Sequence, residues 1–334
     1  MLHKAKRSIL VMFLLLGIII IFISCKKEEK VAGPRDKVTI GVAQQVLSAP
    51  LIIAAEKGYF ADEGLDVTIK NYSFGKVCIE AMLTGEVNLA TVAQMPIVMN
   101  GFKRDDFSVI AAFAYNYDDS KIVVRKDRIR TGSDLKGKKI GTPFGTSAHF
   151  FLDIYMNYSN VPKTSAEVVN ILAEKLPDAM KNGEVDAISS FEPYAYETLK
   201  LLQDKTIRLE SIELFKEAFT LVGMKDFIKN HPEALKRVLR SIDRGIAFIK
   251  KNKRESIGIL TRKLKVDDKF LETAWDGYVF DLSLDHSLLI VMEDQARWAI
   301  KNKRTDKAEV PNYLAFFYLD AMKSVKSDAV TIIK

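Results

Sequence analysis

The chain is poor in the residues that build most catalytic and metal sites. Its 334 residues include two cysteines and four histidines. Cys25 ends an N-terminal apolar segment, which leaves Cys78 without a partner for an internal disulfide. No histidine pair or Cys–His cluster has metal-site spacing, and the sequence contains neither Gly-x-Ser-x-Gly nor a phosphate-loop motif. We therefore predict no catalytic residue, no metal and no cofactor.

The charge pattern lacks the features of nucleic-acid binding. Fifty basic and 43 acidic residues give a formal charge of +7, but the two signs are interspersed and no platform combines aromatic residues with arginines. We expect no nucleic-acid partner and at most a modest preference for anionic ligands or an anionic membrane surface. The adjacent carboxylates Asp118 and Asp119 are typical of solvated loop charges. The length and the hydrophobic content of 48% allow two globular domains.

The N-terminus has the pattern of an export signal. Basic residues at 4, 6 and 7 precede the apolar run 9–23, and Ser24 stands before Cys25. This order is similar to that of a bacterial lipoprotein signal, so we predict a signal peptide over 1–24, lipid attachment at Cys25 and a charged tether over 25–37. An uncleaved N-terminal anchor is the alternative. Either arrangement predicts an extracytoplasmic protein that is attached to the cell membrane.

One short stretch of sequence occurs twice. Residues 81–90 are AMLTGEVNLA and residues 179–188 are AMKNGEVDAI. Each copy has the pattern of a helix that ends at a glycine and continues directly into a buried strand. Their separation favours two similar α/β lobes over a solenoid, whose repeats are about 20–50 residues long. The alternative is that an ordinary α/β protein uses this junction twice.

The order of the predicted elements assigns the chain to two lobes. Alternating strands and helices predict α/β lobes with mostly parallel sheets. We place lobe 1 at 38–118 and 220–330 and lobe 2 at 119–219, with crossing strands at 121–124 and 219–222. After residue 231 the pattern is helical, with one apolar stripe along 235–249. The aromatic residues Trp275, Tyr278, Trp298 and Phe316 are also expected in helices.

The segment Gly145-Thr146-Ser147 is the clearest candidate for a binding site. It lies between a predicted strand and a predicted helix, where free backbone N–H groups and two hydroxyls would bind an anion. Simple N-capping by one of the hydroxyls is the alternative. Ligands of open α/β sheets bind at the carboxyl ends of the strands. The candidate ligand-binding residues in those loops are Gln45, Ser48, Gln94, Phe144, Gly145, Thr146, Ser147, Phe191 and Glu192. Glu192 would either pair with an amino group of the ligand or cap the following helix.

Several weak motifs together resemble one protein family. They include Lys57-Gly58-Tyr59-Phe60, the segment 134–141, the segment 145–149 and Phe191-Glu192-Pro193. In this order they are similar to the substrate-binding proteins of ABC importers for aliphatic sulfonates, taurine, nitrate and thiamine pyrimidines. The resemblance covers about residues 38–260.

The resemblance implies a type II periplasmic-binding-protein fold, in which two lobes joined by two crossing strands close around a ligand cleft by hinge motion. It also implies a small-molecule solute, an ABC permease and its ATPase as partners, and a monomer. By family position, the segment 145–147 would hold the acidic group of the solute. The family often has tryptophan at the place of Phe191. An extracytoplasmic sensor or scaffold without an importer is the alternative. An enzyme of the same fold relies on a cysteine-rich motif that this sequence lacks.

Overall fold

Two mixed β-sheets carry the fold of the computed structural model, which describes residues 35–213 and 216–333. The predicted signal peptide, the lipidation site Cys25 and most of the predicted tether lie outside the described residues. Among the described helices, none is long and apolar enough to cross a membrane.

The larger sheet has six strands in the order β11-β4-β10-β3-β1-β2. Its strands are β1 (Asp36–Ala43), β2 (Leu65–Tyr72), β3 (Leu89–Ala93), β4 (Phe107–Asn116), β10 (Glu217–Met224) and β11 (Tyr278–Ser283). Strands β1, β2 and β3 are parallel to one another, whereas β10 and β4 add antiparallel pairs. Strand β11 extends the sheet antiparallel to β4. The parallel part thus continues into antiparallel strands from later in the chain.

The smaller sheet has five strands in the order β7-β6-β8-β5-β9. Its strands are β5 (Ser120–Arg125), β6 (Lys139–Thr142), β7 (Glu167–Asn170), β8 (Ala187–Phe191) and β9 (Thr206–Arg208). Strands β6, β7 and β8 are parallel, and β5 pairs antiparallel with both β8 and β9. We call residues 35–116 and 217–333 the larger lobe and residues 120–208 the smaller lobe.

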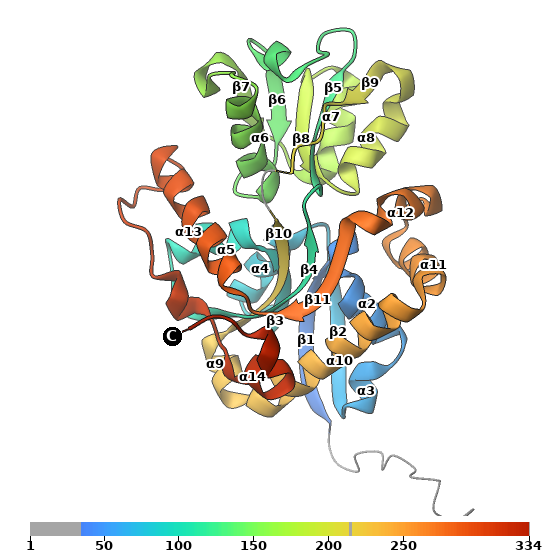
Figure 1. Cartoon of the computed structure of the whole chain (residues 1–334), viewed down its shortest axis with the longest axis vertical. Coiled ribbons are helices and arrows are strands. Elements are labelled where there is room, and N and C mark those ends of the chain that lie inside the picture. Colours follow the sequence, from blue (N-terminus) through green and yellow to red (C-terminus); the bar gives the residue numbers. More distant parts are fainter. Residues whose placement is uncertain (1–34, 214–215, 334) are drawn as a thin grey trace, which may run out of the picture. The chain divides into compact units, whose positions relative to one another are not determined.

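Helices flank both sheets, and two connections join the lobes (Figure 1). The smaller lobe contains α6 (Ser147–Tyr158), α7 (Leu176–Asn182) and α8 (Tyr194–Leu202). The larger lobe contains α2 (Ala49–Glu56), α3 (Tyr59–Asp62), α4 (Gly75–Leu83), α5 (Gln94–Gly101), α9 (Lys225–Asn230), α10 (Pro232–Lys251), α11 (Lys253–Leu264), α12 (Asp268–Ala274), α13 (His286–Lys301) and α14 (Asp320–Lys326). The chain leaves the larger sheet after β4 and returns to it at β10.

The duplicated stretch occupies equivalent places in the two lobes. Gly85 and Gly183 follow helices α4 and α7 with φ angles of 80° and 74°, the left-handed conformation that glycine adopts without strain. The next strand pairs in parallel with an earlier strand of its own lobe in both cases, β3 with β1 and β8 with β6. Asn88 accepts a hydrogen bond from the Thr39 N–H at 2.8 Å, and the equivalent Asp186 accepts one from the Lys139 N–H at 3.0 Å. The repeat therefore reflects a shared structural unit.

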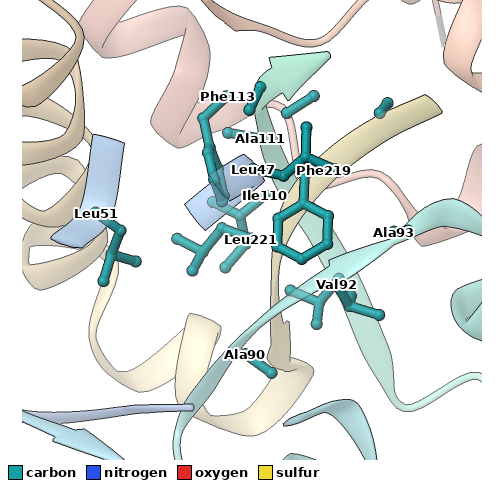
Figure 2. Close-up of a cluster of buried hydrophobic side chains, with 14 of the residues drawn as sticks. Leu47, Leu51, Ala90, Val92, Ala93, Ile110, Ala111, Phe113, Phe219 and Leu221 are labelled. Atoms are coloured by element: carbon teal, nitrogen blue, oxygen red, sulfur yellow. The ribbon is translucent and has the colours of Figure 1, made fainter. Parts of the chain in front are cut away.

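The principal core lies in the larger lobe. Figure 2 shows part of it, where Phe113 of β4 and Phe219 of β10 lie among Leu47, Ile110 and Leu221. The two phenylalanine rings meet edge to face, with centroids 6.0 Å apart and planes at 88°. The predicted apolar stripe of helix α10 is buried along its whole length. Smaller clusters fill both faces of the smaller sheet.

Helix α10 meets helix α2 at an unusually close approach. A Cβ atom at Gly245 would lie 2.2 Å from the backbone oxygen of Pro50. Only glycine leaves room for the two helix backbones at this separation.

Three sequence predictions require correction. Tyr278 begins strand β11 and does not lie in a helix, whereas Trp275 and Phe316 lie in short 3-10 helices and Trp298 lies in α13. The predicted crossing strand at 121–124 belongs wholly to the smaller sheet. The predicted crossing strand at 219–222 belongs wholly to the larger sheet. Strand β4 was missing from the prediction because every one of its residues is buried, so the run has no alternation to reveal a strand.

Candidate functional site

Residues of both lobes enclose a small space, here called the cleft. The larger lobe contributes Gln45, Phe74, Gly75, Lys76, Ala93, Pro96, Glu217 and Phe219, and the smaller lobe contributes Thr146, Ser147 and Phe191. The volume of the cleft is ≈ 10 Å³, which is about the space of one water probe. The two lobes are therefore closed on each other.

Four of the nine predicted ligand-binding residues line this cleft: Gln45, Thr146, Ser147 and Phe191. Gln45 Nε2 donates to the backbone oxygen of Glu192 at 3.4 Å, which connects the lobes. The rings of Phe74 and Phe191 meet with centroids 5.8 Å apart. The cleft thus combines polar groups with an aromatic wall.

The helix start at Thr146 and Ser147 lies at the wall of the cleft. Thr146 is the N-cap residue of α6, but its hydroxyl makes no cap hydrogen bond and donates to the Pro143 oxygen at 2.7 Å. The hydroxyl of Thr146 therefore does not act as a simple N-cap of helix α6. The positive end of the helix dipole faces the cleft through Ser147, which is buried.

Ser48 and Gln94 lie deeper than the cleft wall. Both are fully buried. The Ser48 hydroxyl lies 3.4 Å from the Thr91 hydroxyl. Gln94 donates to the Lys216 oxygen at 3.1 Å and accepts from the Ala218 N–H at 2.9 Å. The Gln94 bonds hold the start of β10, next to the cleft residue Glu217, whereas Ser48 contacts strand β3.

Phe144 and Gly145 line a separate pocket of ≈ 250 Å³ between the lobes. The Phe144 ring stacks on the His149 ring with centroids 4.4 Å apart. His149 Nδ1 accepts a hydrogen bond from the Gly145 N–H at 3.4 Å. Burial, together with the positive charges of Arg304, Lys163 and Lys76, lowers the pKa of His149 to about 3. The ring is therefore neutral at physiological pH.

Glu192 is engaged on both carboxylate oxygens. One oxygen lies 3.2 Å from Lys121 Nζ, and the other accepts the Tyr196 N–H at 2.9 Å in the first turn of α8. The closed form therefore shows Glu192 in the second of its two predicted roles, as a cap of helix α8. Glu192 also lines a pocket of ≈ 500 Å³ that is formed by residues next to β5, α8 and α12.

Buried acids gather where the chain crosses between the lobes. We call this group the hinge cluster; its members are Asp119, Lys121, Glu192, Glu217 and Tyr278. Tyr278 donates to Asp119 at 3.1 Å, and Ser120 donates to Glu217 at 3.4 Å. Asp119 is 3% exposed, so the prediction of a solvated loop charge was wrong for this residue.

Two carboxyls of the hinge cluster, Asp119 and Glu217, have raised pKa values. Burial raises the pKa of Glu217 to about 7, while hydrogen bonds from Ser147 and Ser120 oppose the rise. Burial and the neighbouring charge of Glu217 raise the pKa of Asp119 well above its usual value. Both were missed from the sequence. The available signal was their position, since each acid lies one or two residues before a predicted crossing strand.

Contacts outside the cleft also join the lobes. Trp298 Nε1 donates to Asp153 Oδ2 at 2.9 Å, and Tyr194 donates to the Ser73 oxygen at 3.0 Å. Lys76 Nζ donates to the Phe144 oxygen at 3.0 Å. Among the residues that the structure describes, no group of three or more His, Cys, Asp or Glu could hold a metal ion.

The two-lobe arrangement matches the periplasmic-binding-protein fold. The periplasmic aliphatic sulphonate binding protein SsuA from Escherichia coli superposes with a TM-score of 0.72 at 16% identity, over 86% of this chain and 98% of that protein. The fold also serves a desulfurization enzyme, which matches with a TM-score of 0.68 at 14% identity over 88% of this chain and 99% of that one. The fold match alone therefore does not distinguish a binding protein from an enzyme.

Sequence comparison places the chain more narrowly. The NMT1/THI5-like family model matches residues 45–256, and the chain belongs to this family. It is 26% identical over 242 residues to a putative aliphatic sulfonates-binding protein of Bacillus subtilis, which covers 71% of this chain and 72% of that protein. It is also 26% identical to the taurine-binding periplasmic protein of Escherichia coli, over 63% of this chain and 66% of that one. These relatives are binding proteins.

Proposed function

We propose that this protein is the lipid-anchored, extracytoplasmic solute-binding component of an ABC importer. It closes on a small polar or anionic solute of the sulfonate, taurine, nitrate or thiamine-precursor type and delivers the solute to a permease and its ATPase. The observation that carries this proposal is the closed cleft, because its polar and aromatic groups come from both lobes. The cleft as it stands has room for about one water, so the lobes must part to admit a solute. A solute that then contacts both lobes favours a closed arrangement over the open one.

The cleft offers two different charges to a solute. The start of α6 at Ser147 favours an acidic group, whereas the carboxyl of Glu217 in the same cleft favours an amino group. A solute with only a negative charge would meet Glu217 when that group is ionised. Among the proposed solutes, those that carry an amino group, such as taurine and aminopyrimidines, therefore fit the cleft best. In this role Glu217 replaces Glu192, whose oxygens are already engaged.

A thermal-shift titration of the full chain in detergent tests the proposal. The panel comprises taurine, ethanesulfonate, nitrate and thiamine pyrimidines. A ligand that binds only the folded state adds about 2.7 kcal/mol of stability at a hundredfold excess over its dissociation constant. We expect taurine to raise the melting midpoint more than ethanesulfonate, which differs by the missing amino group. The bound compound should be recovered unchanged, since turnover would indicate an enzyme.

A Glu217→Gln variant sharpens this test. Because it removes the carboxyl but keeps the shape, it should erase the preference for taurine over ethanesulfonate. If the preference survives in this variant, the assignment of Glu217 is wrong. Failure of every solute to raise the midpoint would contradict the proposed solute classes. A permease that co-purifies with the protein supports the importer role, whereas a bound solute without such a permease would favour the sensor alternative.

A further inference from the structure

A second pocket between the lobes, the ≈ 250 Å³ pocket introduced above with Phe144, is rich in positive charge. Its charged and aromatic lining includes Lys76, Lys103, Phe144, His149, Trp298 and Arg304. Lys76 and Lys103 lie on or just after helices α4 and α5, and Arg304 follows α13. Phe144 and His149 come from the smaller lobe. We call this space the basic pocket.

The positive charges of the basic pocket are poorly compensated. Among the described residues that line it, Glu80 is the one acid, and its Oε1 lies 3.9 Å from Lys76 Nζ. Within residues 35–213 and 216–333, neither Lys103 nor Arg304 forms an ion pair. Arg304 lies over the Phe144 ring, 5.2 Å from its centroid. Gathering like charges in one hollow is unfavourable, so an anion placed there would gain from all three cations at once.

His149 supplies an independent sign of a missing acceptor. Its side chain is 1% exposed. Because Nδ1 accepts the Gly145 N–H, the proton of the neutral ring resides on Nε2. Nε2 is buried and has no hydrogen-bond partner in the part of the chain that the structure describes, although a buried polar group without a partner costs about 1–3 kcal/mol. A neutral donor beside three cations is suited to an anion and poorly suited to a metal ion.

From this combination we infer that the basic pocket binds an oxyanion such as sulfate, a sulfonate or phosphate. Because the lining comes from both lobes, a bound oxyanion contacts both and favours the closed form. The site lies outside the cleft, and the inference stands independently of the proposed importer function. Lys76 and Pro96 line both spaces, so the oxyanion is either free or the acidic end of a long solute.

Tryptophan fluorescence provides a local readout. The sequence contains two tryptophans, and Trp298 lines the basic pocket while Trp275 packs on Phe280, 5.7 Å away between ring centroids. In a Trp275→Phe background of the full chain, sodium sulfate should change the Trp298 emission in a saturable way. We expect half-saturation at about 1 mM or below. Sodium chloride at equal ionic strength should leave the emission unchanged.

Charge variants test whether the basic pocket causes the response. Arg304→Gln and, separately, Lys103→Gln should weaken sulfate binding at least tenfold; both side chains are exposed, so folding is preserved. Lys307→Gln is the matched control, since this exposed lysine lies close in sequence but does not line the pocket. The inference is overturned by a linear, non-saturable response. It is also overturned by equal sulfate affinity in Arg304→Gln, Lys103→Gln and the parent protein.

A competition experiment separates the two sources of the oxyanion. Taurine or a long-chain alkanesulfonate is titrated with and without saturating sulfate. Competition supports the acidic end of the solute as the occupant, whereas unchanged or tighter solute binding supports a free oxyanion. If no solute binds but sulfate still does, the proposed function fails while the basic pocket stands.

Discussion

The hinge cluster and the basic pocket place opposite charges at the same interface between the lobes. The hinge cluster holds three buried carboxyls and a single lysine, Lys121. The basic pocket holds three cations and one carboxylate, Glu80. Burial differs as well, since Lys103 and Arg304 are exposed while Glu217 is 3% exposed. The hinge cluster should therefore respond to pH, whereas the exposed cations should respond to salt and anions.

The difference has a consequence for closure. In the hinge cluster, burial of Asp119 and Glu217 favours the protonated forms of these two acids. In the basic pocket, closure brings cations together and favours a bound anion. The stability of the closed form therefore depends on protons in one region and on anions in the other.

Removal of the lysine of the hinge cluster should have the largest effect. Lys121→Met leaves the carboxylate of Glu192 buried without its cation, 3.2 Å away in the parent protein, and breaking such a pair costs about 3–5 kcal/mol. Urea unfolding of the full chain at pH 8 measures the loss. The charge of Lys121 also acts on Glu217. The loss should therefore shrink at pH 5, where the raised pKa of Glu217 keeps that carboxyl protonated.

Lys200→Met is the matched control for this prediction. Lys200 pairs with Asp267 across the lobes at 2.6 Å, but the lysine is exposed and screened by water. The Lys200→Met substitution should lower the free energy of unfolding far less than Lys121→Met does. Its effect should not depend on pH in the same way. Equal losses in the two variants would contradict the distinction between the hinge cluster and the surface.

The pH dependence of stability should originate largely from Glu217. Its folded-state pKa, about 7, lies above the usual value of 4.5. Between these values the folded protein holds a proton that the unfolded chain has lost. Stability therefore falls as the pH rises from about 4.5 to about 7, by up to about 1.4 kcal/mol per pH unit. Glu217→Gln should flatten this part of the stability profile; an unchanged slope would show that another group is responsible.

A smaller effect is expected from a charged contact next to the basic pocket. Trp298→Phe removes the indole N–H that donates to Asp153 at 2.9 Å, and hydrogen bonds to charged groups are worth about 1.5–3 kcal/mol. Asp153 keeps its partner Lys163, also at 2.9 Å, which should hold the loss near the lower figure. Chemical denaturation at neutral pH measures the loss. A loss as large as that of Lys121→Met would contradict this ranking.

The architecture could be predicted from the sequence because the local sequence patterns agree with the fold. The repeated junction at Gly85 and Gly183 marks equivalent turns, and the stripe of α10 marks a buried helix face. Strand β4 was not visible because it is apolar on both faces. Strand β11 was not visible because Tyr278 follows a helical segment and pairs only with distant residues.

The candidate site was only partly visible for a different reason. The predicted loops at the carboxyl ends of the strands were enough to identify four residues of the cleft wall: Gln45, Thr146, Ser147 and Phe191. Burial of a single charged residue in a loop, by contrast, depends on tertiary packing. The position of Asp119 before a predicted crossing strand was a signal, but it did not show that Asp119 is enclosed while its neighbour Asp118 is half-buried. Nothing in the sequence showed that Lys103 and Arg304 share one pocket.

The smallest predicted effect belongs to a neutral contact between the lobes, which serves as a baseline for both charged regions. Tyr194→Phe removes one hydroxyl that donates to the Ser73 oxygen at 3.0 Å, and a neutral hydrogen bond contributes about 0.5–1.5 kcal/mol. The ring remains and keeps its contact with Phe191. Because no charge is involved, the loss should be the same at pH 5 and pH 8 and with or without sulfate. Unfolding free energies in these four conditions measure it, and a loss that varies with pH or sulfate would show that closure couples the whole interface.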